Sequence, residues 1–289
     1  MSPFSPVDLR GFPCQVTRLD DVVYASPNGK PLLADLYLPD EPVRPLPTIL
    51  FLHAGGWLAG DRRLGPDLSR FFAERGFAMV SIDYRLSKEA VFPAALHDVV
   101  TAIQWLRSSA PIYGLDPGRI GLWGASAGAH LAALAALAAP ETEVQAVVAV
   151  YPPVDFLRMG EQAASPKSYE SRFLGAPLRT VPELVARANP ARYARAGAPP
   201  FLLVHGRNDT AVPVGQSEIL YEALRAGGNH VTLSVIEGLG HEFLHDNHFD
   251  QGPPRRHFLR ASRPGETEQS VEAPPLTFGT IEAFFRRHL

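Results

Sequence analysis

Cysteine is nearly absent from this sequence of 289 residues, which contains Cys14 and no other. A single thiol excludes an intramolecular disulfide framework and any metal site built from several cysteines. The sequence also lacks an apolar run of the roughly 20 residues that a membrane-spanning helix needs. Its N-terminus has neither the basic segment nor the apolar core of a signal peptide. We therefore expect a cytoplasmic protein that does not bind a membrane.

Charge of one sign is not in excess either. The 27 basic and 30 acidic side chains leave a net charge of −3, which gives no indication of a nucleic-acid partner. Hydrophobic residues make up 46% of the chain and charged residues 20%, a balance that can bury a sizeable core. The length suits one large α/β domain or two small ones. Because no repeat or linker divides the chain, we expect a single domain over residues 1–289.

Two apolar segments, Val16–Ala25 and Leu32–Leu38, flank the turn residues Ser26–Gly29 and predict an antiparallel hairpin after an irregular arm of residues 1–15. Beyond it, largely apolar strands alternate with helices. The expected strands are 48–53, 77–82, 120–123, 144–150, 201–205 and 231–236, and the expected helices are 64–75, 94–108, 127–139, 214–226 and 278–288. This alternation predicts an α/β fold with a mostly parallel central sheet and helices on both faces.

Two stretches interrupt the alternation. Residues 156–198 follow one strand and precede the next, and they are helical only in patches, so we interpret them as a small lid inserted over the site. Residues 244–275 are rich in Pro, Arg, His and Glu, and their weak periodicity predicts a long loop insertion. Within this loop, residues 245–250 gather side chains of metal-ligand type, but a polar exposed loop is the favoured interpretation and we expect no metal site.

The motif Gly124–Gly128 reads G-x-S-x-G and stands between an apolar strand and a helix rich in Ala and Leu. Strand, sharp turn and helix form the context in which this motif presents a serine for chemistry. The flanking glycines avoid a collision between a Cβ and the neighbouring strand or helix. Free N–H groups and the positive dipole end of the helix favour a developing anion. These features predict that Ser126 is a nucleophile.

A serine hydroxyl needs an adjacent base, and His241 is the candidate because it lies in a glycine-flanked turn after a strand. The preceding strand is followed by Asp209, which would hold the imidazole tautomer and stabilise the imidazolium. The order Ser126, Asp209, His241 is typical of α/β-hydrolases. Asp209 could instead be a turn former, since Asn208 precedes it. Asp155 also follows a strand end, but its place in the chain favours Asp209 as the acid.

The oxyanion of a tetrahedral intermediate needs backbone N–H donors. One should come from Ala127, the residue after the nucleophile, and others from the segment His53–Gly56, a glycine-rich turn after a strand.

Three aromatic residues, Trp57, Tyr84 and Phe156, follow predicted strand ends near the same edge of the sheet. The sequence leaves two interpretations of equal weight open for them, either the lining of a substrate pocket or burial in the core.

The segments His53–Trp57 and Gly124–His130, with Asp209 and His241, resemble the hormone-sensitive-lipase-like esterase branch of the α/β-hydrolase fold. The resemblance covers about residues 20–243 and the last helix, and it is closest to compact bacterial carboxylesterases of the feruloyl- and acetyl-esterase type, with arylformamidases nearby. That branch usually has glycine where this chain has Ala54. The resemblance implies that the neighbouring Gly55 and Gly56 are the donors. The short N-terminal arm is too small for the helical cap of larger members.

These observations predict a serine carboxylesterase that hydrolyses short-acyl or aromatic esters through an acyl-enzyme. Such chemistry requires no metal or organic cofactor, and the expected partner is a small-molecule ester. The sequence leaves the oligomeric state open, with a homodimer among the options. Two alternatives remain: an amide hydrolase of the arylformamidase or peptidase type, which would use the same triad, and a non-catalytic binding module on the same fold.

Overall fold

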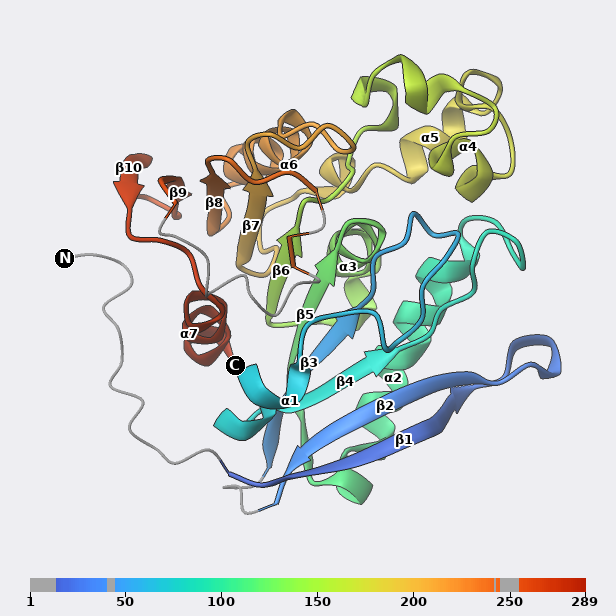
Figure 1. Cartoon of the computed structure of the whole chain (residues 1–289), viewed down its shortest axis with the longest axis vertical. Helices are drawn as coiled ribbons and strands as arrows, with labels where there is room; N and C mark the ends of the chain where they lie inside the picture. The colour runs from blue at the N-terminus through green and yellow to red at the C-terminus, as the bar shows by residue number, and fades with distance from the viewer. Residues whose placement is uncertain (1–13, 41–44, 242, 245–254) are drawn as a thin grey trace.

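The computed structural model describes residues 14–40, 45–241, 243–244 and 255–289. Within them, ten strands form one sheet in the order β1-β2-β4-β3-β5-β6-β7-β8-β9-β10 (Figure 1). The strands are β1 (Val16–Ala25), β2 (Leu32–Pro39), β3 (Leu46–Leu52), β4 (Ala78–Ile82), β5 (Leu115–Ala125), β6 (Ala146–Val150), β7 (Phe201–Gly206), β8 (Val231–Ile236), β9 (His257–Ser262) and β10 (Gln269–Ala273). The predicted arm of residues 1–15 lies almost entirely outside the described residues.

Strand direction divides the sheet into three parts. The six strands from β4 through β8 in the sheet order are parallel to one another. The hairpin of β1 and β2 runs antiparallel at one edge, and β9 and β10 run antiparallel at the other. The predicted hairpin and the mostly parallel sheet are therefore confirmed. In such a sheet the loops after the parallel strands meet at one edge, where ligands bind.

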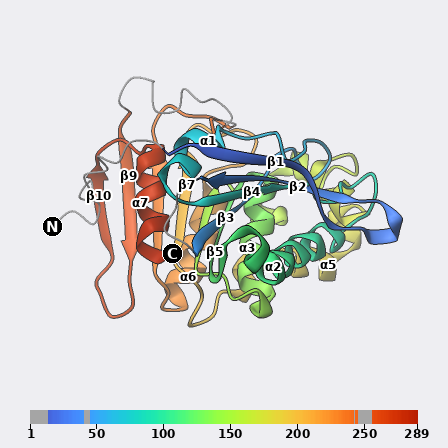
Figure 2. The same cartoon turned by 90° about the horizontal axis from the view of Figure 1, so that it is seen from below.

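Helices cover both faces of the sheet, as Figure 2 shows from below. Helices α2 (Ala94–Tyr113), α3 (Ala127–Ala138) and α6 (Gly215–Ala226) pack on one face, and α1 (Leu68–Phe71) and α7 (Phe278–His288) pack on the other. Side chains alternate along a strand, so β3 sends Leu50 and Leu52 into one apolar cluster and Ile49 and Phe51 into the other. This two-sided burial explains why the parallel strands are apolar throughout.

The predicted helix over residues 64–75 is wrong. Helix α1 has four residues, Leu68–Phe71, and a separate 3-10 turn follows at Ala73–Arg75. Pro66 disfavours helical backbone at Gly65, so the helix cannot begin where the apolar pattern does. Phe72, with φ −134°, then separates the two short pieces.

The predicted long loop over residues 244–275 is also wrong for its second half. Strands β9 and β10 extend the sheet beyond β8, while the proposed ligand-type cluster at residues 245–250 lies outside the described residues. Two ion pairs connect these strands: Arg256, just before β9, pairs with Glu272, and Arg260 pairs with Glu268, just before β10. Strand β10 is the edge strand and exposes four of its five residues, so its sequence shows no alternation of apolar residues.

Residues 156–198 form an insertion of short helices, including α4 (Tyr169–Leu174) and α5 (Pro182–Arg187), beyond the carboxyl ends of the strands (Figure 1). Two buried contacts join the insertion to the body of the protein. The His130 Nε2–H donates to the Ala188 carbonyl at 2.7 Å, and the Phe173 ring stacks on Trp57 with centroids 4.5 Å apart. The insertion is therefore packed into the same core as helix α3.

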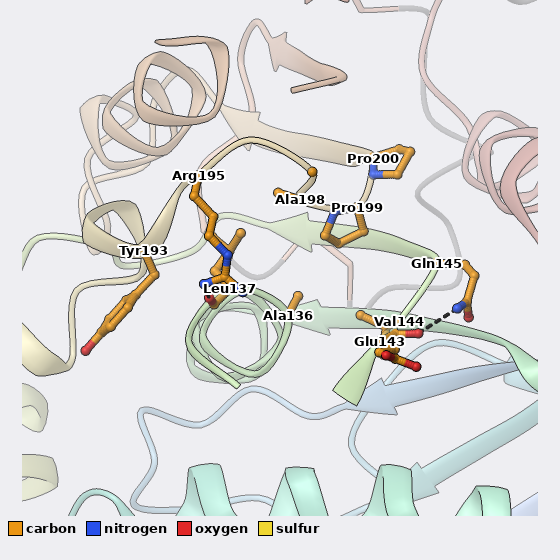
Figure 3. Close-up of a pocket in the computed structure, with 11 residues that line it drawn as sticks. Ala136, Leu137, Glu143, Val144, Gln145, Tyr193, Arg195, Ala198, Pro199 and Pro200 are labelled. Atoms are coloured by element: carbon orange, nitrogen blue, oxygen red, sulfur yellow. Dashed lines mark hydrogen bonds between the residues drawn. The ribbon is translucent and has the colours of Figure 1, made fainter. Parts of the chain in front are cut away.

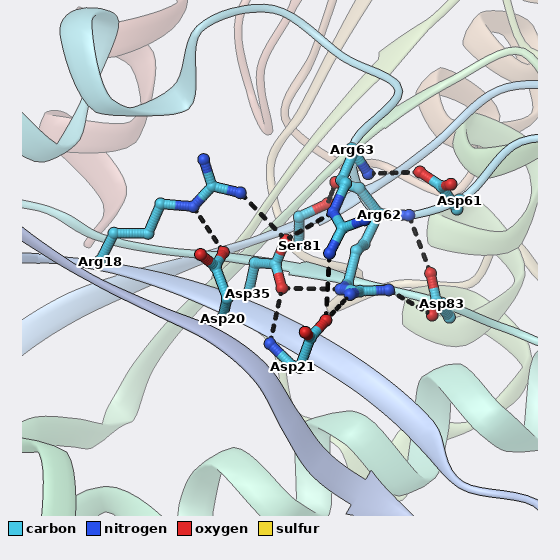
Figure 4. Close-up of polar contacts among 9 residues, drawn as sticks. All are labelled: Arg18, Asp20, Asp21, Asp35, Asp61, Arg62, Arg63, Ser81 and Asp83. Carbon is cyan, nitrogen blue, oxygen red and sulfur yellow. Dashed lines mark hydrogen bonds and ion pairs between the residues drawn. The ribbon is translucent and has the colours of Figure 1, made fainter.

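A buried arginine links the hairpin to the loop that follows β3. The Arg62 guanidinium donates to Asp35 at 2.6 Å and to Asp83 at 2.8 Å, and it also pairs with Asp21 (Figure 4). Burial acts to raise the pKa of Asp35, but hydrogen bonds from the Asp21 N–H and Arg62 outweigh it and lower that pKa below its usual range. The network fixes residues 61–63 against β2 and β4.

Among the helices of the described residues, none combines the length and the apolar character that crossing a bilayer requires.

Candidate active site

Ser126 lies on a sharp turn between β5 and α3. Its backbone has φ 51° and ψ −118°, and its N–H donates to the Val150 carbonyl at 2.9 Å. A non-glycine residue pays a conformational cost at such angles, so the surroundings must hold it there. Gly128 makes the close packing possible, since a Cβ on it would lie 2.1 Å from the Leu52 carbonyl oxygen. The predicted turn geometry is thus present, and it holds the start of α3 against the end of β3.

The three residues of the predicted triad follow the ends of β5, β7 and β8 and lie together in the structure. The Ser126 hydroxyl lies 3.0 Å from His241 Nε2, and His241 Nδ1 lies 2.6 Å from Asp209 Oδ2. The ionised carboxylate can only accept, so Nδ1 carries the imidazole proton and Nε2 is left to accept from the serine. This arrangement can remove the Ser126 proton as the oxygen attacks a carbonyl carbon.

The carboxylate of Asp209 is fixed by its own turn. Its Oδ1 accepts from the N–H groups of Ala211 at 2.9 Å and Val212 at 2.8 Å. Burial acts to raise the pKa of Asp209, but hydrogen bonds from His205, His241 and the Val212 N–H outweigh it and hold that pKa well below its usual range. Asp209 therefore remains charged at neutral pH and can stabilise an imidazolium on His241.

Sequence reasoning missed His205, at the end of β7, as a neighbour of the triad. Its Nε2–H donates to the Val212 carbonyl at 2.8 Å and lies 3.4 Å from Asp209 Oδ2, while its Nδ1 accepts from the Ser217 hydroxyl at 2.7 Å. The imidazole is fully buried and connects three segments behind the carboxylate. The sequence offered one indication of this contact, because His205 lies four residues before Asp209 at the end of the same strand.

Asp155, the alternative acid, has a different role in the structure. Its side chain accepts from the Leu157 N–H at 3.1 Å and caps a 3-10 turn, while its own N–H donates to Gln216 Oε1 at 2.7 Å. The carboxylate that accepts from His241 is that of Asp209.

The loop after β3 holds the predicted oxyanion donors. Gly55 has φ 118°, and its carbonyl accepts from the N–H groups of Leu58 and Ala59 at 3.0 Å. A Cβ on Gly55 would lie 2.0 Å from the Ala59 carbonyl oxygen, so only glycine fits there. Gly56 follows in left-handed backbone, with φ 59°. Ala54 is buried in the apolar cluster under α7, which explains why a methyl group is accommodated at this position.

The three predicted rim aromatics lie in the core. Trp57, Tyr84 and Phe156 are exposed by 1%, 2% and 2%. Trp57 packs between Phe156 and Phe173 of the insertion, with centroids 5.5 and 4.5 Å away. The expectation that these side chains line an open substrate pocket is therefore wrong for this structure, and the core interpretation applies. The burial of Trp57 depends on partners from the insertion that the sequence does not identify, whereas Tyr84 stacks on His53 with centroids 4.2 Å apart.

A hollow of about 460 Å³ lies at the opposite end of the sheet (Figure 3). Its lining includes Val144 and Gln145, just before β6, and Pro199 and Pro200, just before β7. The five residues of β6 span about 16 Å and separate this hollow from the edge that carries Ser126. The hollow is therefore not part of the triad site.

Comparison with known proteins gives the family. Residues 34–224, more than half of the chain, match the BD-FAE family. The chain belongs to the BD-FAE family. This membership, together with the relatives below, confirms the predicted hormone-sensitive-lipase-like branch of the α/β-hydrolases.

Curated proteins similar to this chain include two of Mycobacterium tuberculosis. Esterase LipC is 34% identical over 71% of this chain and 55% of its own length, and Esterase LipQ is 33% identical over 83% of this chain and 60% of its own length. This chain thus spans less than two thirds of either relative. A solved structure titled as the truncated form of a carbohydrate esterase from gut microbiota superposes with a TM-score of 0.72. It is 28% identical and covers 81% of this chain and 91% of its own, which confirms the predicted fold.

Proposed function

We propose that this chain is one α/β-hydrolase domain that hydrolyses carboxylic esters through an acyl-enzyme. The observation that carries the proposal is the continuous hydrogen-bonded series Ser126, His241 and Asp209 at the carboxyl edge of the sheet. Relatives that bear esterase names over most of this chain support the same chemistry. His241 provides the base that the serine needs, and the Asp209 carboxylate provides the charge that orients that base.

The reaction has two halves. Ser126 Oγ attacks the ester carbonyl carbon while its proton moves to His241 Nε2, and the charge on His241 is balanced by Asp209. The tetrahedral intermediate then collapses, and the alcohol leaves with the proton from Nε2. In the second half, water loses a proton to Nε2 and attacks the acyl carbon. The bond from the acyl carbon to Ser126 Oγ then breaks as Nε2 returns the proton to Oγ, which releases the acid and restores the free hydroxyl.

We propose that the N–H groups of Gly55, Gly56 and Ala127 hold the oxyanion. The packing of Gly128 against the carbonyls of Leu52 and His53 supports this, because it brings the loop after β3 onto the first turn of α3. Each donor of this kind contributes about 10²- to 10³-fold to the rate in serine hydrolases.

We propose short-acyl or aromatic esters as substrates. The likeness to a gut carbohydrate esterase supports esters carried on sugars as one source of such groups. The triad would also cleave amides, so a matched anilide belongs in the substrate series.

The test compares wild type with Ser126→Ala on 4-nitrophenyl acetate and 4-nitroacetanilide. We expect ester turnover in the wild type, weaker anilide turnover, and loss of at least about 10³-fold in the variant. Ser108→Ala, an exposed serine on α2, is the matched control and should keep the wild-type rate. Full ester activity in Ser126→Ala would contradict the assigned nucleophile. Dominant anilide turnover would contradict the ester preference, and a wild type inactive on both would favour a binding module.

A further inference from the structure

Tyr169 is an exposed aromatic residue in the insertion. It is the first residue of α4 and is 56% exposed, whereas Phe173, one turn later in the same helix, is buried. Single exposed aromatic rings are common on protein surfaces, so exposure alone indicates nothing. The position of the ring relative to the proposed oxyanion loop is what distinguishes it.

The Tyr169 ring lies directly on the backbone of Gly56. A Cβ built on Gly56 would be 2.4 Å from Tyr169 Cδ1 and 2.8 Å from its Cγ. Because glycine has no side chain, nothing intervenes between the ring and the peptide that carries a proposed oxyanion donor. A carbonyl group bound by that donor would therefore have the Tyr169 ring beside it.

The helix that carries the ring is held in place before any substrate arrives. Ser168 caps α4 by accepting from the Ser171 N–H at 3.0 Å, which fixes the helix start at Tyr169. The stack of Phe173 on Trp57 anchors the same helix to the loop after β3. Substrate binding would thus cost little ordering of this part of the chain, which favours its use in recognition.

The charge of the insertion restricts what the ring can bind. Residues 156–198 contain seven lysine or arginine residues and three glutamates, a net positive segment in a chain of net charge −3. Burial also raises the pKa of Glu170, next to Tyr169, which opposes a negative charge there. An aromatic ring can bind cations or other rings, and the net positive charge of the insertion disfavours a cationic ligand. Neutral or anionic rings are favoured.

We propose that Tyr169 is a specificity-determining residue that stacks against a neutral or anionic aromatic ring of the ester. The proposal rests on the proposed ester hydrolysis at Ser126 and names a substrate class for that same site. A stacking residue of this kind contributes to binding in the ground state and the transition state alike, so its removal raises KM more than it lowers kcat.

The experiment measures kcat and KM for methyl benzoate, phenyl acetate and ethyl acetate in wild type, Tyr169→Ala and Tyr169→Phe. The first ester places the ring on the acyl side and the second on the alcohol side, while the third has no ring. For Tyr169→Ala we expect about a tenfold rise in KM for at least one aryl ester, the scale of one aromatic contact with its buried area. Loss on ethyl acetate should stay below about twofold. Tyr169→Phe should restore the aryl preference.

Ile112→Ala, which removes a 77% exposed apolar side chain from α2, is the control and should leave all three substrates unchanged. An unchanged aryl-to-ethyl ratio in Tyr169→Ala would overturn the proposal while leaving ester hydrolysis intact. Equal loss on all three esters would also overturn it, since it would indicate damage to the oxyanion loop. Absence of Ser126-dependent ethyl acetate turnover in the wild type would instead reject the proposed function.

Discussion

Replacing His130 with glutamine should reduce the loss of unfolding free energy that accompanies a fall in pH. His130 is fully buried on α3, and its ring packs against Trp57 and Phe156 with centroids 5.1 and 5.2 Å away. Its Nε2–H donates to the Ala188 carbonyl at 2.7 Å. Burial lowers the pKa of His130 to about 4, and the Ala188 carbonyl offsets only part of that effect. The folded protein therefore keeps this side chain neutral at pH values where the unfolded chain protonates it.

The sign and size of the effect follow from that pKa. The unfolded chain binds a proton at His130 below about pH 6.5. The folded protein does so only below about pH 4. The contribution is fully present above pH 6.5 and is lost as the pH falls from there toward 4. A shift of this size corresponds to about 3 kcal/mol of unfolding free energy over that interval.

Urea unfolding followed by tryptophan fluorescence, at several pH values between 7.5 and 4.5, measures the change. Glutamine can still donate to the Ala188 carbonyl but does not titrate, so His130→Gln should lose roughly 2 kcal/mol less than wild type over this range. Contributions from the buried His257 and from His288 are common to both proteins and cancel in the difference. His97→Gln, which changes an exposed histidine, should behave as wild type. Parallel stability profiles for wild type and His130→Gln would refute the reasoning.

Two further predictions concern charge. Asp209→Asn should keep the turn at Ala211 but present the wrong imidazole tautomer, so kcat should fall about 10³- to 10⁴-fold. Its Tm should fall as well, because the buried charge that the fold stabilises at neutral pH is lost. An activity within tenfold of wild type would count against the assigned acid. Arg62→Met removes the closest cation from the fully buried Asp35 and should cost about 3 kcal/mol in urea unfolding at pH 7, whereas the exposed Arg63→Met should cost under about 1 kcal/mol. Equal losses in the two arginine variants would show that burial does not decide their contributions.

The triad could be predicted because local rules fix each of its parts. The glycines around Ser126 indicate a tight turn that only small residues permit. Asp209 and His241 follow parallel strands, and the carboxyl ends of parallel strands meet at the same edge of a sheet. His205 could not be assigned in this way, because its role depends on a side chain at Ser217 and a carbonyl at Val212 that come together only in the fold.

The direction of the aromatic side chains was beyond sequence reasoning for a physical reason. Trp57 follows a strand end and could point toward solvent or core, and the choice is set by Phe173, which is distant in the chain. The last two strands were missed because the edge strand β10 exposes four of its five residues and β9 buries only His257 and Leu259. Hydrophobic periodicity identifies strands that bury at least one face, but it does not identify a strand that exposes both.

The shared core of insertion and body has a consequence for transplanting substrate preference between relatives. An insertion taken from another member would remove Phe156 and Phe173 and leave the Trp57 and His130 rings without their partners. A chimera limited to residues 156–198 would therefore open a cavity beside α3. The insertion, the first turns of α3 and the loop after β3 form one packing unit, so these three separate segments must be exchanged together.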